Sequence, residues 1–248
     1  MTAYLQAELL KLRTTRTFVA LTSVAVGISI VIVVLVTTIS EPTEESVLTD
    51  VFTADLSSLF ILVLAVIGIT GEWRHRTITS SLLAAPDRVR FLAAKTLAFA
   101  AAGAVLSVLI SLAIFIVGFV ILTARDLPTP DFADLLEQLG RNAAIALLLG
   151  ALGVGLGALV RNQVVAIVGL LVFSFVVEPT LMALVDEVGR FGPFGALPTA
   201  VQGVPPEDVG YPADTDLLAP GLALLAMFVW IGGAFAIGAW LLRRRDLT

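Results

Sequence analysis

The chain has 248 residues, of which 58% are hydrophobic and only 14% charged, and its formal net charge at pH 7 is -5. A soluble protein of this composition would expose large apolar patches to water, so the composition excludes that class and indicates lipid as the main solvent. The sequence has no cysteine, which excludes disulfides, thiolate metal sites and thiol catalysis, and its single histidine, His75, cannot form a histidine metal centre alone. We therefore expect an all-α integral membrane protein with no metal site.

Residues 1–17 precede the first apolar run and are weakly amphipathic. Leu5, Leu9 and Leu12 share one helical stripe, whereas Lys11 lies away from it. This pattern predicts an N-terminal helix that lies along the membrane interface. A positively charged anchor that only orients the first spanning helix explains the pattern equally well.

Six apolar runs are long enough to cross a bilayer, which takes about 20 residues of helix. Only Arg161, Asn162 and Gln163 separate the fourth run from the fifth. A single helix through both runs would be roughly 63 Å long, twice what a bilayer can hold, so a tight turn is favoured at these residues. We predict one transmembrane domain of residues 1–248, with spanning helices at about 18–39, 52–70, 97–123, 143–160, 164–184 and 217–242.

The basic residues of the chain are distributed unevenly across this arrangement. Only Arg125, Arg141 and Arg190 fall on one side, and most acidic residues share that side. The positive-inside rule makes the other, basic side cytoplasmic and places both termini there. A basic cytoplasmic face also suits anionic lipid headgroups and an acidic protein surface, although topology determination alone explains most of the asymmetry.

Residues 72–95 connect the second span to the third and form the one densely charged internal stretch. Thr77 can cap a short helix, Pro86 prevents that helix from continuing, and Asp87 can cap the helix that enters the membrane. The apolar residues of the short helix would be Ile78, Leu82 and Leu83.

The helix after Asp87 carries Arg88 and Lys95 on one face, as an anchor at the membrane surface requires. A generic membrane loop would need these charges but not the apolar short helix before them. The spacing alone gives equal weight to a protein-docking segment and to a structural hairpin.

Two connections on the opposite side of the membrane are predicted to be ordered. Residues 131–139 have apolar residues at helical spacing, which predicts a short surface helix before the fourth span. Residues 185–216 are rich in proline and glycine, yet Phe191, Phe194 and Leu197 make them too apolar for a free linker. We predict a structured extracellular loop at 185–216, and long structured loops are often functional.

Glycines gather in the fourth and sixth spans. No phosphate-binding loop of the Gly-x-x-x-x-Gly-Lys-Ser/Thr type occurs in the sequence, and the glycine cluster of the fourth span lacks the lysine that such a loop needs. Close helix packing explains these glycines better than nucleotide binding does. The predicted packing residues are Gly150, Gly153, Gly157, Gly232 and Gly233.

Two carboxylates, Asp55 and Glu178, lie within or beside apolar runs. An intramembrane carboxylate is by default a functional-site hypothesis, so both are candidate substrate-pathway residues. An ion-coupled secondary transporter that uses Asp55 and Glu178 is the alternative function. For Glu178 we favour a simpler interpretation, in which Pro179 breaks the helix and Glu178 meets water at the outer surface.

The pattern of residues 72–95 resembles that of the ABC-2 type exporter permeases, which are the transmembrane subunits of ATP-binding-cassette exporters. Six spans match the usual number in this family, and the run from Glu8 to Arg16 is similar to its entry segment. Where the family usually has glycine before Thr77, this chain has Arg76, so the turn cannot use the freedom of glycine at positive φ. The matching residues are Glu72, Thr77, Leu82, Leu83, Pro86, Arg88 or Arg90, and Lys95.

The resemblance implies a type V exporter-like transmembrane domain, in a multi-pass permease subunit of a bacterial cell membrane. It implies two partners, an ATPase subunit that binds ATP and Mg and a second permease copy or paralogue, together with membrane lipids and no nucleic acid. This chain would carry no cofactor and no catalytic residue, and it would export a hydrophobic or amphipathic substrate. The residues implied in ATPase coupling are Glu8, Lys11, Arg13, Glu72, Arg74, Arg76, Thr77, Ile78, Leu82, Leu83, Pro86, Arg88, Arg90 and Lys95.

Overall fold

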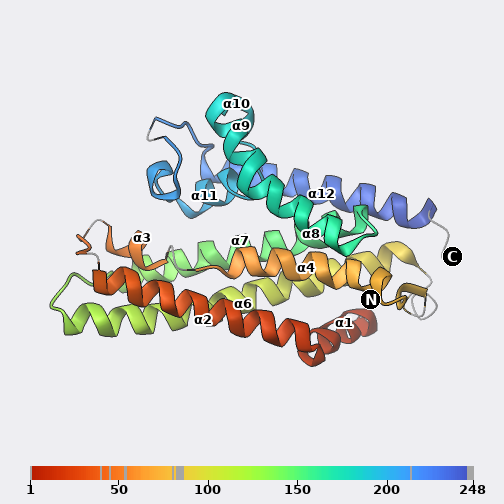
Figure 1. Ribbon diagram of the computed structural model, residues 1–248, viewed down its shortest axis with the longest axis horizontal. Helices are drawn as coiled ribbons and strands as arrows, with labels where there is room; N and C mark the ends of the chain where they lie inside the picture. Colours follow the sequence, from red (N-terminus) through yellow and green to blue (C-terminus); the bar gives the residue numbers. More distant parts are fainter. Residues whose placement is uncertain are drawn as a thin grey trace.

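The computed structural model describes residues 2–39, 41–44, 46–52, 55–79, 81, 87–212 and 214–244. In these ranges every regular element is a helix, and most of the long helices run roughly along one axis (Figure 1). The first helix, α1 (Thr2–Thr14), lies at the same end of the molecule as the last residues of α12 (Pro220–Arg244). This arrangement places the two ends of the described chain on one side of the helical bundle.

Six helices in the described part of the chain are long and apolar enough to cross a membrane, which confirms an all-α, multi-pass membrane protein. Three shorter helices, α3 (Val47–Phe52), α10 (Asp186–Gly189) and α11 (Ala196–Gln202), and a 3-10 turn, η2 (Pro206–Val209), lie in the connections. The six long helices are α2 (Arg16–Ile39), α4 (Ser57–Arg74), α6 (Arg88–Ala124), α7 (Phe132–Leu159), α12, and a composite of α8 (Gln163–Val172), η1 (Phe173–Val177) and α9 (Glu178–Leu184).

The start of the fourth span differs from the sequence prediction, because polar residues continue a helix when they find partners. The surface helix predicted at 131–139 and the fourth span form one helix, α7, in which buried Gln138 donates to Asn142 over 3.0 Å. Helix α6 begins at Arg88, directly after Asp87 as the sequence predicts, so Lys95 lies two turns inside it. The predicted tight turn is present, since α7 ends at Leu159 and α8 begins at Gln163.

The centre of the bundle is α7, which α4, α6 and α12 surround. A Cβ atom on Gly150 would lie 2.5 Å from the Phe99 carbonyl oxygen, and one on Gly153 would lie 2.7 Å from that of Leu62. A Cβ on Gly157 would lie 2.4 Å from a methyl carbon of Ile69. These three glycines therefore allow the close helix packing that the sequence predicts.

The packing expectation for Gly232 and Gly233 does not hold within the described chain. No described atom lies within 4 Å of a Cβ built on either residue, and both are exposed. Helix α12 instead approaches α7 through Gly238, whose Cβ would lie 2.9 Å from that of Ala158. Within the described chain, α12 therefore packs on α7 through a face other than that of Gly232 and Gly233.

The interpretation that Pro179 breaks the fifth span is also wrong. The helix passes through Pro179 by widening into the π-helical turn η1, in which the Glu178 N–H donates to the Phe173 carbonyl, five residues earlier. Proline lacks the N–H that a regular α-helix would use at this point, and a π-turn changes the local hydrogen-bonding pattern without ending the helix. Glu178 is consequently buried, with 1% of its surface exposed.

Candidate functional site

One end of the bundle carries most of the chain's basic residues, and we call it the basic end. It contains α1, the end of α4, the start of α6 and the end of α12. Contacts across it join these elements: the Arg88 guanidinium donates to the carbonyls of Leu242 and Arg243 on α12. Arg74 on α4 donates to Gln163 at the start of α8 over 3.3 Å.

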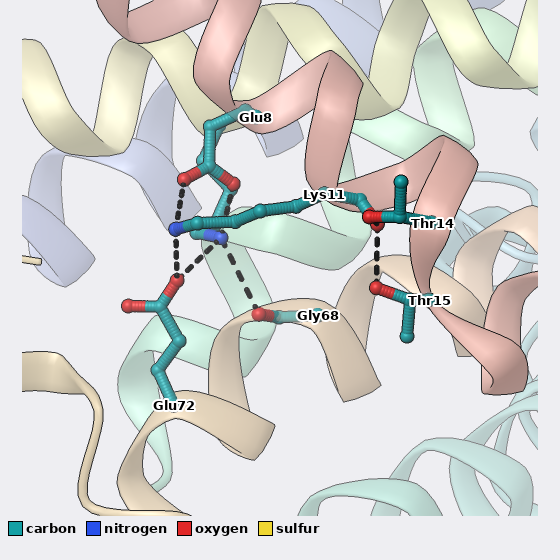
Figure 2. A network of polar contacts seen from close by, with 7 residues as sticks. Glu8, Lys11, Thr14, Thr15, Gly68 and Glu72 are labelled. Atoms are coloured by element: carbon teal, nitrogen blue, oxygen red, sulfur yellow. Dashed lines mark hydrogen bonds and ion pairs between the residues drawn. The ribbon is translucent and has the colours of Figure 1, made fainter.

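A network of four charged side chains, three of them buried, connects three helices at the basic end (Figure 2). The Lys95 ammonium on α6 lies 2.5 Å from a carboxylate oxygen of Glu8 on α1 and 2.9 Å from one of Glu72 on α4. Lys11, one turn after Glu8, reaches the same two carboxylates at 2.7 and 3.3 Å. Two ammonium groups thus share two carboxylates, and the positions of α1, α4 and α6 depend on one another.

Burial makes this network energetically important. Lys95 is 2% exposed, Glu8 5% and Glu72 7%. A charge taken out of water is costly unless a partner of opposite sign replaces the lost hydration. Lys95 also donates to the Gly68 carbonyl over 3.4 Å, so the described chain supplies an acceptor for each of its three N–H bonds.

The two α1 residues show the electrostatic consequence. Burial by itself raises the pKa of Glu8, but the charge of Lys95 and the hydrogen bond from Lys11 outweigh it and hold that pKa below the ordinary value. For Lys11, burial lowers the pKa, while hydrogen bonding to Glu8 and the charge of Glu72 reverse this and raise it. Both residues are therefore charged at neutral pH, as ion pairing requires.

The chain leaves α4 through a Schellman turn. The Thr77 N–H donates to the Glu72 carbonyl and the Arg76 N–H to that of Trp73, the two hydrogen bonds that define this motif. Arg76 occupies the left-handed position with φ of 56°, where glycine is usual. Arg76, which stands where the family usually has glycine, thus has a backbone conformation that glycine would adopt without strain.

After this turn the predicted short helix begins, since Ile78 and Thr79 are helical and the Ser81 N–H donates to the Thr77 carbonyl. Ile78 is buried, whereas Arg13, Arg74, Arg76 and Thr77 are exposed. Three residues named for this segment, Leu82, Leu83 and Pro86, lie outside the described residues.

The start of α6 confirms the sequence prediction at Asp87 and contradicts it at Lys95. The Asp87 carboxylate accepts from the N–H groups of Val89 and Arg90, which confirms it as the helix cap. The prediction that Lys95 anchors the helix at the membrane surface is wrong, because Lys95 is buried in the ion network, whereas Arg88 is only partly buried and donates to the last carbonyls of α12. Arg90 remains exposed and pairs with Asp87 at 3.1 Å.

A cavity of about 820 Å³ adjoins the network. Apolar and polar residues of α1, α2, α4 and α6 line it, and Gly71 leaves space along the α4 wall, whereas the Phe99 ring fills the space beside Gly68. Sequence reasoning missed this cavity. The signal available was Gly71, which directly precedes the Glu72 already singled out.

The opposite end holds the two candidate pathway carboxylates, and they are not in one site. Glu178 accepts hydrogen bonds from the N–H groups of Phe194, Gly195 and Ala196 at 3.1, 2.6 and 2.9 Å. These groups begin α11, so Glu178 fastens the loop of residues 185–216 to the fifth span. Its carboxylate is occupied by backbone donors rather than open to a cargo.

Asp55 lies in a separate polar cluster between α4, α6 and α7. Its carboxylate accepts from Ser111 at 2.5 Å, from Asn142 at 3.3 Å and from the Ser57 N–H at 2.8 Å. It also borders a cavity of about 450 Å³ that Arg141 helps to line. The structure therefore separates Asp55, which borders open space, from Glu178, which holds a loop.

Comparison of the sequence with protein-family models and with curated proteins found no match.

Proposed function

We propose that this chain is the membrane-spanning permease subunit of an ATP-driven exporter, of the ABC-2 type that its sequence resembles. In this proposal the basic end faces the cytoplasm, because basic residues concentrate there. A separate ATPase subunit binds ATP and Mg and docks at this end. A second permease copy or paralogue completes the assembly.

The observation that carries the proposal is the network of buried Glu8, Glu72 and Lys95 with half-exposed Lys11. It connects α1 and the end of α4, the two segments that the resemblance implies in ATPase coupling, to the spanning helix α6. An ion pair of this burial resists separation, because parting the charges would leave them unpaired in a low-dielectric environment. A push on α1 or on the connector therefore moves α4 and α6 as one body.

The exposed surface beside the network supplies a docking face of suitable charge. Arg13, Arg74 and Arg76 are all exposed at the basic end. Charge complementarity across an interface raises the rate of association and fixes its register. We expect an acidic surface on the ATPase to meet these three residues.

The test is the affinity of the purified chain for a co-expressed ABC ATPase subunit. The double variant Arg74→Glu and Arg76→Glu should weaken assembly by about tenfold or more, since like charges would then face each other. The control is Arg190→Glu, the same reversal at the opposite end, where Arg190 lies 3.5 Å from exposed Asp216. Equal affinities for all three chains would refute the docking assignment.

Asp55 supports a second candidate function, an ion-coupled secondary transporter. Its carboxylate lies among the hydroxyls of Ser107 and Ser111 and the amide of Asn142, beside a cavity, as a proton or cation site would require. Transport that persists without ATP and is abolished in Asp55→Asn would support this candidate over the exporter. Transport that requires ATP and survives in Asp55→Asn would exclude it.

A further inference from the structure

An apolar cavity lies beside the fifth span. Its volume is about 340 Å³, and residues of α4, α7, α8, η1, α12 and the loop of residues 185–216 line it. Every described residue of the lining is apolar or glycine, apart from Trp230, whose indole N–H already donates to the Phe191 carbonyl over 2.9 Å. An apolar cavity offers water no partners, so hydrocarbon suits this space better than water does.

The cavity extends from the basic end over a depth of less than one membrane leaflet. Val165, near the start of α8, and Phe173, the first residue of η1, both line it and are separated by roughly 12 Å of helix. The Phe194 ring packs edge to face on Phe173 with 5.6 Å between ring centroids, and the Phe194 N–H donates to Glu178 of the fifth span. Aromatic rings thus bound the cavity on the side of the outer loop. One leaflet supplies about 15 Å, half of a 30 Å hydrocarbon core.

The lining reaches from the protein core to the surface of the spanning helices. Val66 and Leu170 are 1% and 6% exposed, whereas Val165 is 57% and Trp230 39% exposed. An empty cavity loses the dispersion contacts of its walls, and lipid chains are the solvent at the surface of a spanning helix. We therefore expect an acyl chain to enter this space. Because the chain leaves hydrocarbon, the gain is the dispersion contacts rather than removal of the chain from water.

A cation lies at the basic end of the cavity. Arg161 directly follows Val160 and precedes Val165 by four positions, and both valines line the cavity. The exposed Arg161 guanidinium lies 4.9 Å from the centroid of the Trp73 ring. Trp73 is seven positions after Val66 on α4, so the two share a helix face and Trp73 lies roughly 10 Å nearer to the basic end. Stacking on Trp73 therefore holds the guanidinium in line with the α4 wall of the cavity.

We propose that this cavity binds one acyl chain of an anionic phospholipid from the leaflet at the basic end, with the lipid phosphate beside Arg161. The acyl chain lies along Val165, Gly169 and Phe173. A guanidinium presents a planar set of N–H donors that matches a phosphate. A second copy of this chain could cover the mouth of the cavity but not fill it, because helices of one chain form the walls. The site requires only a membrane location, so it does not depend on the proposed exporter function.

The wild-type chain provides the first test, by native mass spectrometry of the purified protein without an ATPase. The probes are dioctanoyl phosphatidylglycerol, which is anionic, dioctanoyl phosphatidylcholine, which has no net charge, and glycerol 3-phosphate, which has no acyl chain. The glycerol lipid should bind about fivefold more tightly than the choline lipid, as expected for one exposed basic residue near a lipid phosphate. Equal affinities, displacement of the lipid by glycerol 3-phosphate, or a lipid-free dimer that binds neither lipid would overturn the proposal.

Gly169 gives a variant that fills the cavity. It lines the cavity, and no described atom lies within 4 Å of a Cβ built on it. Gly169→Leu should lower the affinities for both lipids by at least about fivefold, without loss of stability, because leucine occupies the space of the acyl chain and favours the helix. The matched control is Gly27→Leu on α2, also exposed and with no described atom within 4 Å of its Cβ. Unchanged lipid binding in Gly169→Leu, or weaker binding together with a loss of stability, would refute the site.

Arg161→Gln tests the headgroup contact separately from the acyl chain. It should lower the affinity for the glycerol lipid to that for the choline lipid, and it should leave the choline lipid unaffected. A general loss of folding would instead weaken both lipids. The control is Arg16→Gln, which removes another exposed arginine of the basic end and should retain the preference for the glycerol lipid. Retained preference in Arg161→Gln, or an equal loss of preference in Arg16→Gln, would contradict the assignment of the phosphate to Arg161.

Discussion

Replacing Lys95 by methionine should destabilise the protein more than any surface change. Methionine fills a similar volume but leaves the carboxylates of Glu8 and Glu72, 5% and 7% exposed, to share Lys11 alone. Removing one partner of a buried ion pair typically costs about 3–5 kcal/mol. Since a folded domain is stable by only about 5–15 kcal/mol, the expected loss is a large part of the total.

The measurement is the free energy of unfolding in a detergent micelle, by titration with sodium dodecyl sulfate and tryptophan fluorescence. A loss below about 1 kcal/mol for Lys95→Met would refute the reasoning, because it would mean that the carboxylates do not depend on Lys95. The double variant Lys95→Met with Glu72→Gln should recover most of the loss, since the pair of Glu8 and Lys11 then remains intact.

The pH dependence follows from the lowered pKa of Glu8. A carboxyl whose folded pKa lies below its unfolded value stabilises the protein above the unfolded value, and this stability disappears as pH falls through the folded pKa. The wild type should therefore lose stability as pH falls below about 4.5, the ordinary value for glutamate. Lys95→Met should lose less over the same interval, so the difference between the two proteins should shrink in acid.

Three further substitutions test separate parts of the fold. In the dodecyl sulfate titration, Arg76→Gly should stabilise the protein by about 1 kcal/mol, because an L-residue at φ of 56° is strained. No gain in stability would mean that the turn is not strained at Arg76. Gly153→Leu should cost about 3 kcal/mol, since its Cβ would meet the Leu62 carbonyl at 2.7 Å, and Gly233→Leu should cost little; equal effects would contradict the packing described for α7. Glu178→Gln should speed tryptic cleavage at Arg190 by about tenfold, because the loop of residues 185–216 loses charge-assisted hydrogen bonds. The control is Glu187→Gln, a substitution of an exposed residue that should leave the cleavage rate unchanged. Equal cleavage rates in the two variants would show that Glu178 does not hold the loop.

Local features of the fold were predictable from the sequence. Apolar length identified the six long helices, and Asp87 was recognised as a cap because its side chain needs only the N–H groups two and three residues ahead. The unusual arginine before Thr77 was visible because the family resemblance places glycine at that position. Each of these inferences depends on a few consecutive residues.

The site itself depends on residues distant in sequence, and this part could not be predicted. Glu8 and Lys95 are 87 positions apart, and nothing in the sequence around Lys95 shows that it faces a carboxylate rather than the membrane surface. The same holds for Glu178, whose partners lie across a loop in the backbone of α11. Gly232 and Gly233 show a second limit of sequence-based prediction: small residues in a helix do not specify which of its faces packs against a neighbouring helix.

The most direct test of the central claim is a crosslink between the basic end and an ATPase subunit. Because the chain contains no cysteine, the variants Arg74→Cys and Arg190→Cys each provide a single labelling site at opposite ends of the bundle. In membranes that contain the co-expressed ATPase, the account predicts a permease–ATPase crosslink from position 74 that changes in yield on addition of ATP and Mg, and none from position 190. A crosslink of equal yield from both positions, or none from position 74 while transport continues, would contradict it.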